Sequence, residues 1–121
     1  MSINVVNLAE KFARFDEHWH PFIVAELNGQ HVKLAKLEGD FVWHSHAAED
    51  EMFLVVQGNL RIELRDGVVE LSAGELCVVP RGVEHRPVAD GLVHVMLFEP
   101  ASTAHTGDRE TDRTVKHLTW I

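Results

Sequence analysis

Alternation of apolar and polar residues predicts a protein built mainly from short β-strands. Leu60, Ile62 and Leu64 alternate with charged residues, and residues 68–72 continue the alternation after a short polar break. Successive side chains of a strand point to opposite faces of a sheet, so this pattern predicts a half-buried antiparallel ribbon around Asp66-Gly67.

Three dipeptides typical of tight turns separate the predicted strands. They are Asn28-Gly29, Asp66-Gly67 and Asp90-Gly91. Such dipeptides supply the positive φ values of two-residue hairpin turns. The runs 52–57, 75–79 and 92–98 are more continuously apolar, which predicts strands covered on both faces, inside a barrel or under a partner subunit. Many short strands at hairpin spacing favour an all-β sandwich or barrel.

Only the first fifteen residues show helical spacing. Leu8, Phe12 and Phe15 lie at i, i+4 and i+7, and Asn7 and Glu10 have the spacing of a capping box. A short helix is therefore expected here, the alternative being an arm that orders only against the barrel.

The chain divides into three parts within a single domain, residues 1–121. We expect an N-terminal helix or arm over 1–21, a barrel over 22–100 and a C-terminal tail over 101–121. The tail is polar at first but ends on Trp120 and Ile121. Such an ending favours docking of the terminus on the barrel or on a neighbouring subunit.

Composition narrows the classes of function. The chain has 121 residues, 19 acidic against 11 basic residues and a formal charge of −8, with no basic patch. This charge disfavours binding to nucleic acid or to an anionic membrane surface. No apolar run approaches the length of a membrane helix, and the N-terminus lacks the features of a signal peptide. A lone cysteine, Cys77, fits a reducing compartment, so a cytoplasmic location is expected.

Histidine is the unusual component, with nine residues in so short a chain. His44 and His46 are two residues apart on a strand-like segment, so both imidazoles leave the same face. Glu51 follows at the start of the next strand, and His85 comes just after a turn containing Pro80 and Gly82. Three imidazoles and one carboxylate would form a site suited to Fe, Mn, Ni, Co, Cu or Zn as divalent ions rather than to Ca or Mg.

These residues lie in two motifs that resemble those of the cupin superfamily. The first motif, Gly then His-x-His-x(3–4)-Glu-x6-Gly, is matched from Gly39 through His44, His46 and Glu51 to Gly58. The second, Gly-x5-Pro-x-Gly-x2-His-x3-Asn, is matched by Gly74, Pro80, Gly82 and His85. Two departures are visible: Gly39 lies one residue closer to His44 than usual, and Ala89 replaces the final Asn.

The resemblance covers Val32 to about Pro100. It implies a double-stranded β-helix, or jelly-roll barrel, with one divalent transition metal per chain at His44, His46, Glu51 and His85. Residues in register with these ligands are then expected to line a pocket. They are Val42, Phe53, Val55 and Gln57, with His94 added if it points inward with Met96 and Phe98. The remaining histidines, including His105, are expected at the surface or at strand edges.

Two classes of function fit the motifs. The first is a small metalloenzyme, similar to dioxygenases, lyases or isomerases, that acts on a small soluble metabolite. The second is a binding or sensing module without turnover. The mostly apolar walls favour a small carboxylate, diol or enediol over a sugar phosphate, unless Arg81, Arg86 or the tail near Thr106-Gly107-Asp108 folds over the pocket mouth and supplies polar groups. A homodimer is expected because open sheet edges need cover.

Overall fold

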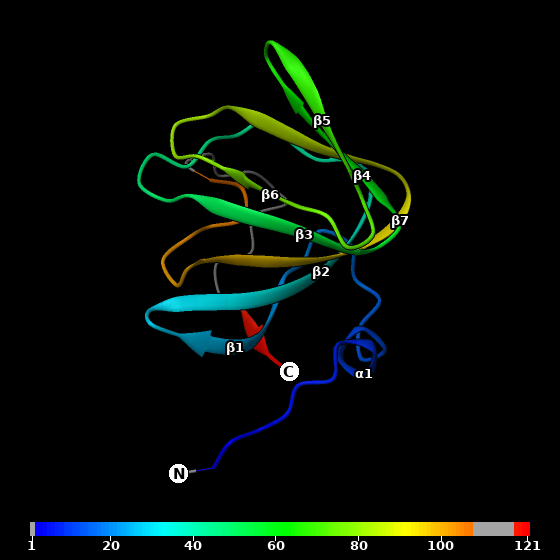
Figure 1. Ribbon diagram of the computed structural model, residues 1–121, viewed down its shortest axis with the longest axis vertical. Helices are drawn as coiled ribbons and strands as arrows, with labels where there is room; N and C mark the ends of the chain where they lie inside the picture. Colours follow the sequence, from blue (N-terminus) through cyan, green and yellow to red (C-terminus); the bar gives the residue numbers. More distant parts are fainter. Residues whose placement is uncertain (1, 108–117) are drawn as a thin grey trace.

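The computed structural model describes residues 2–107 and 118–121 and is built mainly of β-strands (Figure 1). The strands are β1 Phe22–Leu27, β2 Gln30–Asp40, β3 Glu51–Gln57, β4 Asn59–Leu64, β5 Gly67–Ser72, β6 Leu76–Val79, β7 His85–Pro100 and β8 Thr119–Trp120. One short helix, α1, spans Leu8–Phe12. The prediction of an all-β barrel with a short N-terminal helix is confirmed. No helix of the described residues is long and apolar enough to cross a bilayer.

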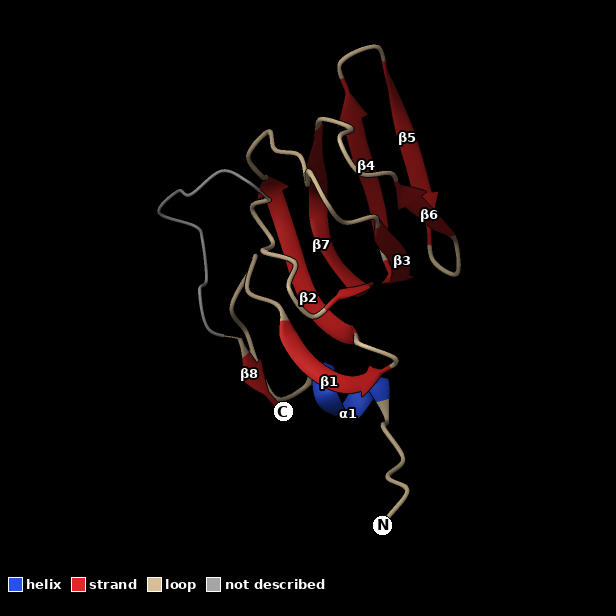
Figure 2. Ribbon diagram, turned by 90° about the vertical axis from the view of Figure 1, so that its left-hand side faces the viewer, coloured by secondary structure: helices blue, strands red, loops and turns tan. Residues whose placement is uncertain are grey.

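Strand β7 connects the two halves of the barrel. Its first residues pair with β4, its last residues pair with β3, and β2 runs antiparallel to it along most of its length. The other strands extend from this centre, in the order β5-β4-β7-β2-β1-β8, with β6 beside β3 (Figure 2). The long strands β2 and β7 therefore belong to both halves of the jelly roll and connect the strands that surround its interior.

Two of the three predicted hairpins form. Asn28 and Gly29 connect β1 to β2 with positive φ values of 52° and 77°, as the dipeptide predicts. The ribbon of β4 and β5 also forms, but Gly67 already pairs with Leu64. The turn consequently lies one residue earlier than the Asp66-Gly67 pattern suggests.

The predicted hairpin at Asp90-Gly91 is wrong. Both residues lie inside β7, opposite a register shift in β2: Leu37 pairs with Val93, whereas Gly39 pairs with Ala89. The extra residues form a bulge that bends one continuous strand, because bulges increase local twist and bending.

Helix α1 and the described C-terminal residues pack on the outer face of the barrel. The side chain of Asn7 accepts a hydrogen bond from the backbone N–H of Glu10, which caps α1 as predicted. Phe12 and Phe15 are buried against Phe22, Val24 and Leu34. The described C-terminal residues 118–121 add β8 to β1 in parallel, and the amide of Ile121 donates to the carbonyl of Ile23. The terminus thus docks on the barrel, as expected.

Alternation along the strands separates the interior from the outer face. On β3, Phe53 and Val55 face the buried interior, whereas Met52 and Leu54 face outward and are partly exposed. In the run 75–79, Leu76 and Val78 are each 55% exposed, so the barrel covers one face of this strand and the other face is left for the predicted partner subunit.

Candidate metal centre

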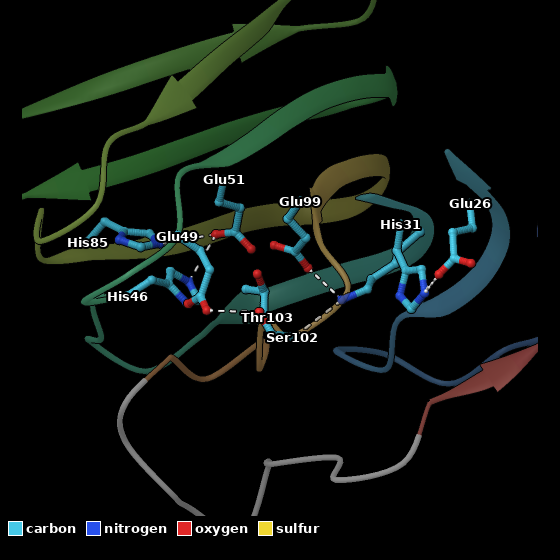
Figure 3. A network of polar contacts seen from close by, with 10 residues as sticks. Glu26, His31, His46, Glu49, Glu51, His85, Glu99, Ser102 and Thr103 are labelled. Carbon is cyan, nitrogen blue, oxygen red and sulfur yellow. Dashed lines mark hydrogen bonds and ion pairs between the residues drawn. The ribbon is translucent and has the colours of Figure 1, made fainter. Parts of the chain in front are cut away.

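Four side chains from the two motifs meet inside one end of the barrel. One potential ligand atom from each of His44, His46, Glu51 and His85 lies within 4.8 Å of the others, and all four residues are buried. Glu51 is the first residue of β3 and His85 the first residue of β7. His44 and His46 belong to the segment between β2 and β3, and Figure 3 shows His46, Glu51 and His85 pointing toward one another.

Hydrogen bonds to the backbone orient two of the imidazoles. Nδ1 of His44 lies 2.9 Å from the carbonyl oxygen of Val42, and Nδ1 of His85 lies 2.9 Å from that of Val83. A carbonyl oxygen only accepts, so in both rings Nδ1 carries the proton and donates it. Nε2 of each ring is left with its lone pair directed into the cluster, which is the arrangement of metal-binding histidines.

The electrostatics favour a neutral His44 beside an ionised Glu51. Burial, followed by the neighbouring charge of His85, lowers the pKa of His44 to about 4. Burial alone would raise the pKa of Glu51, but polar contacts from Glu99, His46 and His85 outweigh it and hold that pKa well below its usual value. At neutral pH His44 is therefore neutral and Glu51 is ionised, which are the states in which these groups bind a metal.

The donor set fits a transition metal. Among the described residues, no hydrogen-bond partner satisfies Nε2 of His44, Nε2 of His85 or Oε1 of Glu51, although all three atoms are buried. Nε2 of His46 and Nε2 of His85 each lie 3.4 Å from Oε1 of Glu51. Ligand atoms about 2.0–2.3 Å from a shared ion are at most about 4.6 Å apart, which is close to the observed spread. The cluster could hold one such ion with little movement.

A cavity opens directly beside this cluster. Its empty volume is about 350 Å³, including space open to solvent. Apolar residues form most of the wall, and His44, Glu51 and His105 contribute the polar groups. The lining residues are Trp19, Pro21, Ala35, Leu37, Phe41, His44, Glu51, Phe53, Pro87, Val95, Leu97 and His105.

Only one of the residues predicted to line the pocket does so. Phe53 lines the cavity, whereas Val55 is fully buried in the hydrophobic core. Val42 is not part of the wall, and its carbonyl instead orients His44. Gln57 follows a register shift at the far end of β3 and is exposed.

His94 lies outside the barrel. Inward positions on β7 are Val93, Val95 and Leu97, so His94 faces the opposite way. There it stacks on Phe12 of α1, with ring centroids 4.4 Å apart. It therefore cannot contact a molecule in the cavity.

His105 and Trp19 are among the cavity residues that were not identified from the sequence. His105, expected at the surface, is only 7% exposed and stacks on Phe41. Trp19 has a positive φ of 59°, stacks on Phe41 at 4.5 Å and donates its indole N–H to the carbonyl of Glu38. Non-glycine residues in this strained region are concentrated at functional sites, but the sequence alone gives no sign of it.

A buried ion pair behind Glu51 was also missed. Lys33 and Glu99 are both fully buried, and their side chains lie 2.9 Å apart (Figure 3). Burial, together with the adjacent charge of Glu51, raises the pKa of Glu99 well above its usual value. The available signal was the position of Glu99 on the same face of β7 as Val93, Val95 and Leu97, where a charged residue is unusual.

Comparison with known proteins agrees with this geometry. The chain is similar to a cupin-2 domain protein from Shewanella frigidimarina NCIMB 400, with 48% identity, a TM-score of 0.79 and coverage of 79% of this chain and 94% of that one. It is 36% identical over 66 residues to the uncharacterised protein YdbB of Bacillus subtilis (strain 168), covering 54% of this chain. That match spans 58% of YdbB, so somewhat over half of this relative is represented.

Similarity of fold extends to a larger enzyme. Hydroquinone 1,2-dioxygenase from Sphingomonas sp. TTNP3, solved with 4-hydroxybenzoate bound, superposes with a TM-score of 0.71 at 18% identity, over 83% of this chain and 33% of that one. The model of the cupin domain matches residues 30–99, which contain both motifs and all four clustered side chains. On this match and on the fold, the chain belongs to the cupin family.

Proposed function

We propose that His44, His46, Glu51 and His85 bind one divalent transition metal, and that the protein is a small metalloenzyme acting on a small metabolite in the adjoining cavity. The observation that carries the proposal is the orientation of His44 and His85, whose Nδ1–H groups are held by carbonyls so that Nε2 faces Glu51. When bound, such a metal would supply Lewis acidity or redox chemistry beside the cavity.

The cavity supports a small and only partly polar substrate. Trp19, Phe41 and Phe53 provide aromatic walls, and a mostly apolar wall with a few polar groups is typical of sites for small molecules. A small carboxylate, diol, enediol or phenol would place its oxygen atoms toward the cluster and its carbon skeleton against these walls. The aromatic ligand of the structurally similar dioxygenase is consistent with this class.

Sugar phosphates are poor candidates. The guanidinium of Arg81 lies 3.4 Å from Asp50 and that of Arg86 lies 2.7 Å from Glu63, and neither arginine lines the cavity. Desolvating a doubly charged phosphate without a paired cation is costly. We therefore expect weak or no binding of sugar phosphates.

The tail contributes one polar group to the cavity. Residues 101–107 pack beside the first motif and bring His105 to the wall that also contains His44 and Glu51. An imidazole can donate or accept a hydrogen bond, so His105 is suited to orient a polar substituent of the substrate.

Metal analysis and turnover assays test the proposal in sequence. Protein purified without an affinity tag is analysed for metal, reconstituted separately with Fe²⁺, Mn²⁺, Ni²⁺, Co²⁺, Cu²⁺ or Zn²⁺, and screened with small acids, diols and phenols. Dioxygen consumption would support a dioxygenase, and product formed without dioxygen would support a lyase or isomerase. Tight binding without conversion would favour a binding module. Failure to bind any metal stoichiometrically would contradict the proposal.

We also propose that the chain forms a homodimer through the outer face of its sheet. Met52 pairs with Val78 on one side and Phe98 on the other, and Leu54 pairs in the same way with Leu76 and Met96. These outward residues form two adjacent apolar rows, of which Leu76 and Val78 are the most exposed. Exposed contiguous apolar surface of this kind is typical of an interface between subunits.

A further inference from the structure

The buried ion pair of Lys33 and Glu99 lies immediately behind the metal centre. Nζ of Lys33 donates to Oε1 of Glu99 at 2.9 Å, and neither side chain is exposed to solvent. Burying both charges has a large desolvation cost, and well-packed apolar residues often stabilise a fold equally well. Stabilisation of the fold is therefore a weak explanation for the presence of this buried ion pair.

Glu99 connects the pair to a proposed metal ligand. Its Oε1 accepts from Lys33, whereas its Oε2 receives no hydrogen bond from any residue that the structure describes. The carboxyl groups of Glu99 and Glu51 point toward each other (Figure 3), and each group shifts the pKa of the other. The opposite side of the Glu51 carboxylate, at Oε1, faces Nε2 of His46 and His85. Glu51 is thus held between Glu99 and the histidines.

Lys33 also contacts the segment that brings His105 to the cavity. Its ammonium lies 3.3 Å from the carbonyl oxygen of Thr103 and donates to it. Thr103 in turn donates its amide to the carbonyl of Pro100, closing a turn at the end of β7. One ammonium group therefore contacts both the residue behind Glu51 and the segment 101–107.

We propose that Lys33 and Glu99 are positioning residues that orient the Glu51 carboxylate for metal binding and hold residues 101–107 against the cavity. This inference rests on the proposed metal site. Metal-ligating carboxylates are commonly oriented by such outer hydrogen bonds, and loss of an outer partner typically lowers metal affinity about 10- to 100-fold.

Two double variants separate positioning from a structural role. Lys33→Met/Glu99→Leu removes both buried charges and leaves no polar group facing Glu51 at this position. Lys33→Met/Glu99→Gln also removes both charges but keeps an amide that can donate to Glu51. Glu26→Gln, at an exposed carboxylate on β1 that contacts His31, is the control. Each protein is titrated with Co²⁺ alone, and its visible absorption spectrum is recorded together with its thermal midpoint.

We expect the Leu double variant to bind Co²⁺ about 10- to 100-fold more weakly than the unmodified protein, with an altered spectrum. The Gln double variant and the control should lie within a few-fold of the unmodified protein. The inference would be overturned if the Leu double variant had the same Co²⁺ affinity and spectrum as the unmodified protein. It would also be overturned if the Gln double variant bound Co²⁺ as weakly as the Leu double variant. If the unmodified protein itself binds no Co²⁺, it is the proposed function that fails.

A single variant and hydrogen exchange complete the test. Should the Leu double variant not fold, Glu99→Asp keeps both charges but withdraws the carboxyl by one methylene, and about tenfold weaker Co²⁺ binding is expected. Both double variants lack the ammonium of Lys33, so exchange at the amides of Thr103 and Gly107 should be faster than in the unmodified protein. Unchanged exchange would overturn the role of Lys33 in holding the tail.

Discussion

The backbones of His44 and His85 form a reciprocal hydrogen-bonded pair. The amide of His44 donates to the carbonyl of His85 at 3.0 Å, and the amide of His85 donates back at 2.9 Å. The two imidazole centroids are 4.3 Å apart, although 41 positions separate the residues in the chain. This bridge joins the two sequence motifs directly, so the spacing of the proposed ligands depends on the backbone as well as on side-chain rotamers.

Replacing His85 by alanine should reduce metal affinity by more than about 100-fold, because it removes a ligand rather than an outer partner. Equilibrium dialysis against a buffered metal concentration measures the change. His94→Ala is the matched control, since this histidine stacks on Phe12 outside the barrel. Equal metal content in the His85 variant and the unmodified protein would show that His85 is not a ligand.

Chelated, metal-free protein should lose stability as the pH falls from about 6.5 to about 4. The pKa of His44 is about 4 in the folded protein, against 6.5 for an unperturbed histidine, so the unfolded chain binds this proton more readily within that window. This difference between the folded and the unfolded pKa of His44 corresponds to at most about 3 kcal/mol in the free energy of unfolding. Above pH 6.5 this histidine contributes no pH dependence.

Urea denaturation in the presence of a chelator, repeated at several pH values, measures this effect. The His44→Gln variant should show a flatter dependence between pH 4 and 6.5. An equally steep dependence in both proteins would assign the effect to other groups.

Substitution of Gly107 by alanine should destabilise the tail and weaken ligand binding in the cavity. A Cβ at this position would collide with the carbonyl oxygen of Ser45 and lie 3.1 Å from Cδ2 of His44, and the φ of 64° is itself unfavourable for alanine. Gly29→Ala is the control for backbone strain alone, because its φ is 77° and its Cβ would meet no neighbour.

Both alanine variants should lose about 1–2 kcal/mol of stability from the left-handed backbone. Only the Gly107 variant should lose more than this and also show weaker binding of a small phenol or carboxylate by calorimetry. Identical losses in the two variants, with unchanged binding, would exclude a close packing role for the tail.

Introduction of lysine at Val78 should shift the proposed dimer toward monomer. Val78 lies in the exposed apolar rows of β6 and β3, and burial of an unpaired ammonium at an interface is costly. Val68→Lys is the control, because Val68 is similarly exposed, at 51%, but lies on β5. Sedimentation velocity at micromolar concentration distinguishes the species. A monomeric unmodified protein, or a Val78 variant that still dimerises fully, would contradict the proposed interface.

The two motifs were visible in the sequence because ligand spacing and turn residues are local properties. Alternation placed Phe53 on the face of Glu51, and the structure keeps it there. The same rule failed for Gln57, because a register shift after Val55 interrupts the alternation. Bulges of this kind depend on the neighbouring strand and leave little local signal.

The polar residues around the centre were hidden for a different reason. Glu99, Lys33 and His105 reach the site only through the pairing of β2 with β7 and the path of the tail, which are contacts between distant segments. In the sequence Lys33 and His105 look like ordinary surface residues, and Glu99 alone shares a strand face with apolar residues. The pairing of β2 with β7 and the path of residues 101–107 therefore had to be known before these residues could be connected with Glu51.

The bulge in β7 determines which changes of length the barrel can accept. Between the pairs Leu37–Val93 and Gly39–Ala89, β2 advances by two residues and β7 by four, so the excess is even. Side chains alternate with a period of two, and an even excess leaves Val95, Leu97 and Glu99 facing inward. Deleting Gly91 alone would turn Met96 and Phe98 toward the metal centre and expel Glu99, whereas deleting Gly91 and Leu92 together would preserve the inward face. Length variation at this point is thus compatible with the site only in steps of two residues.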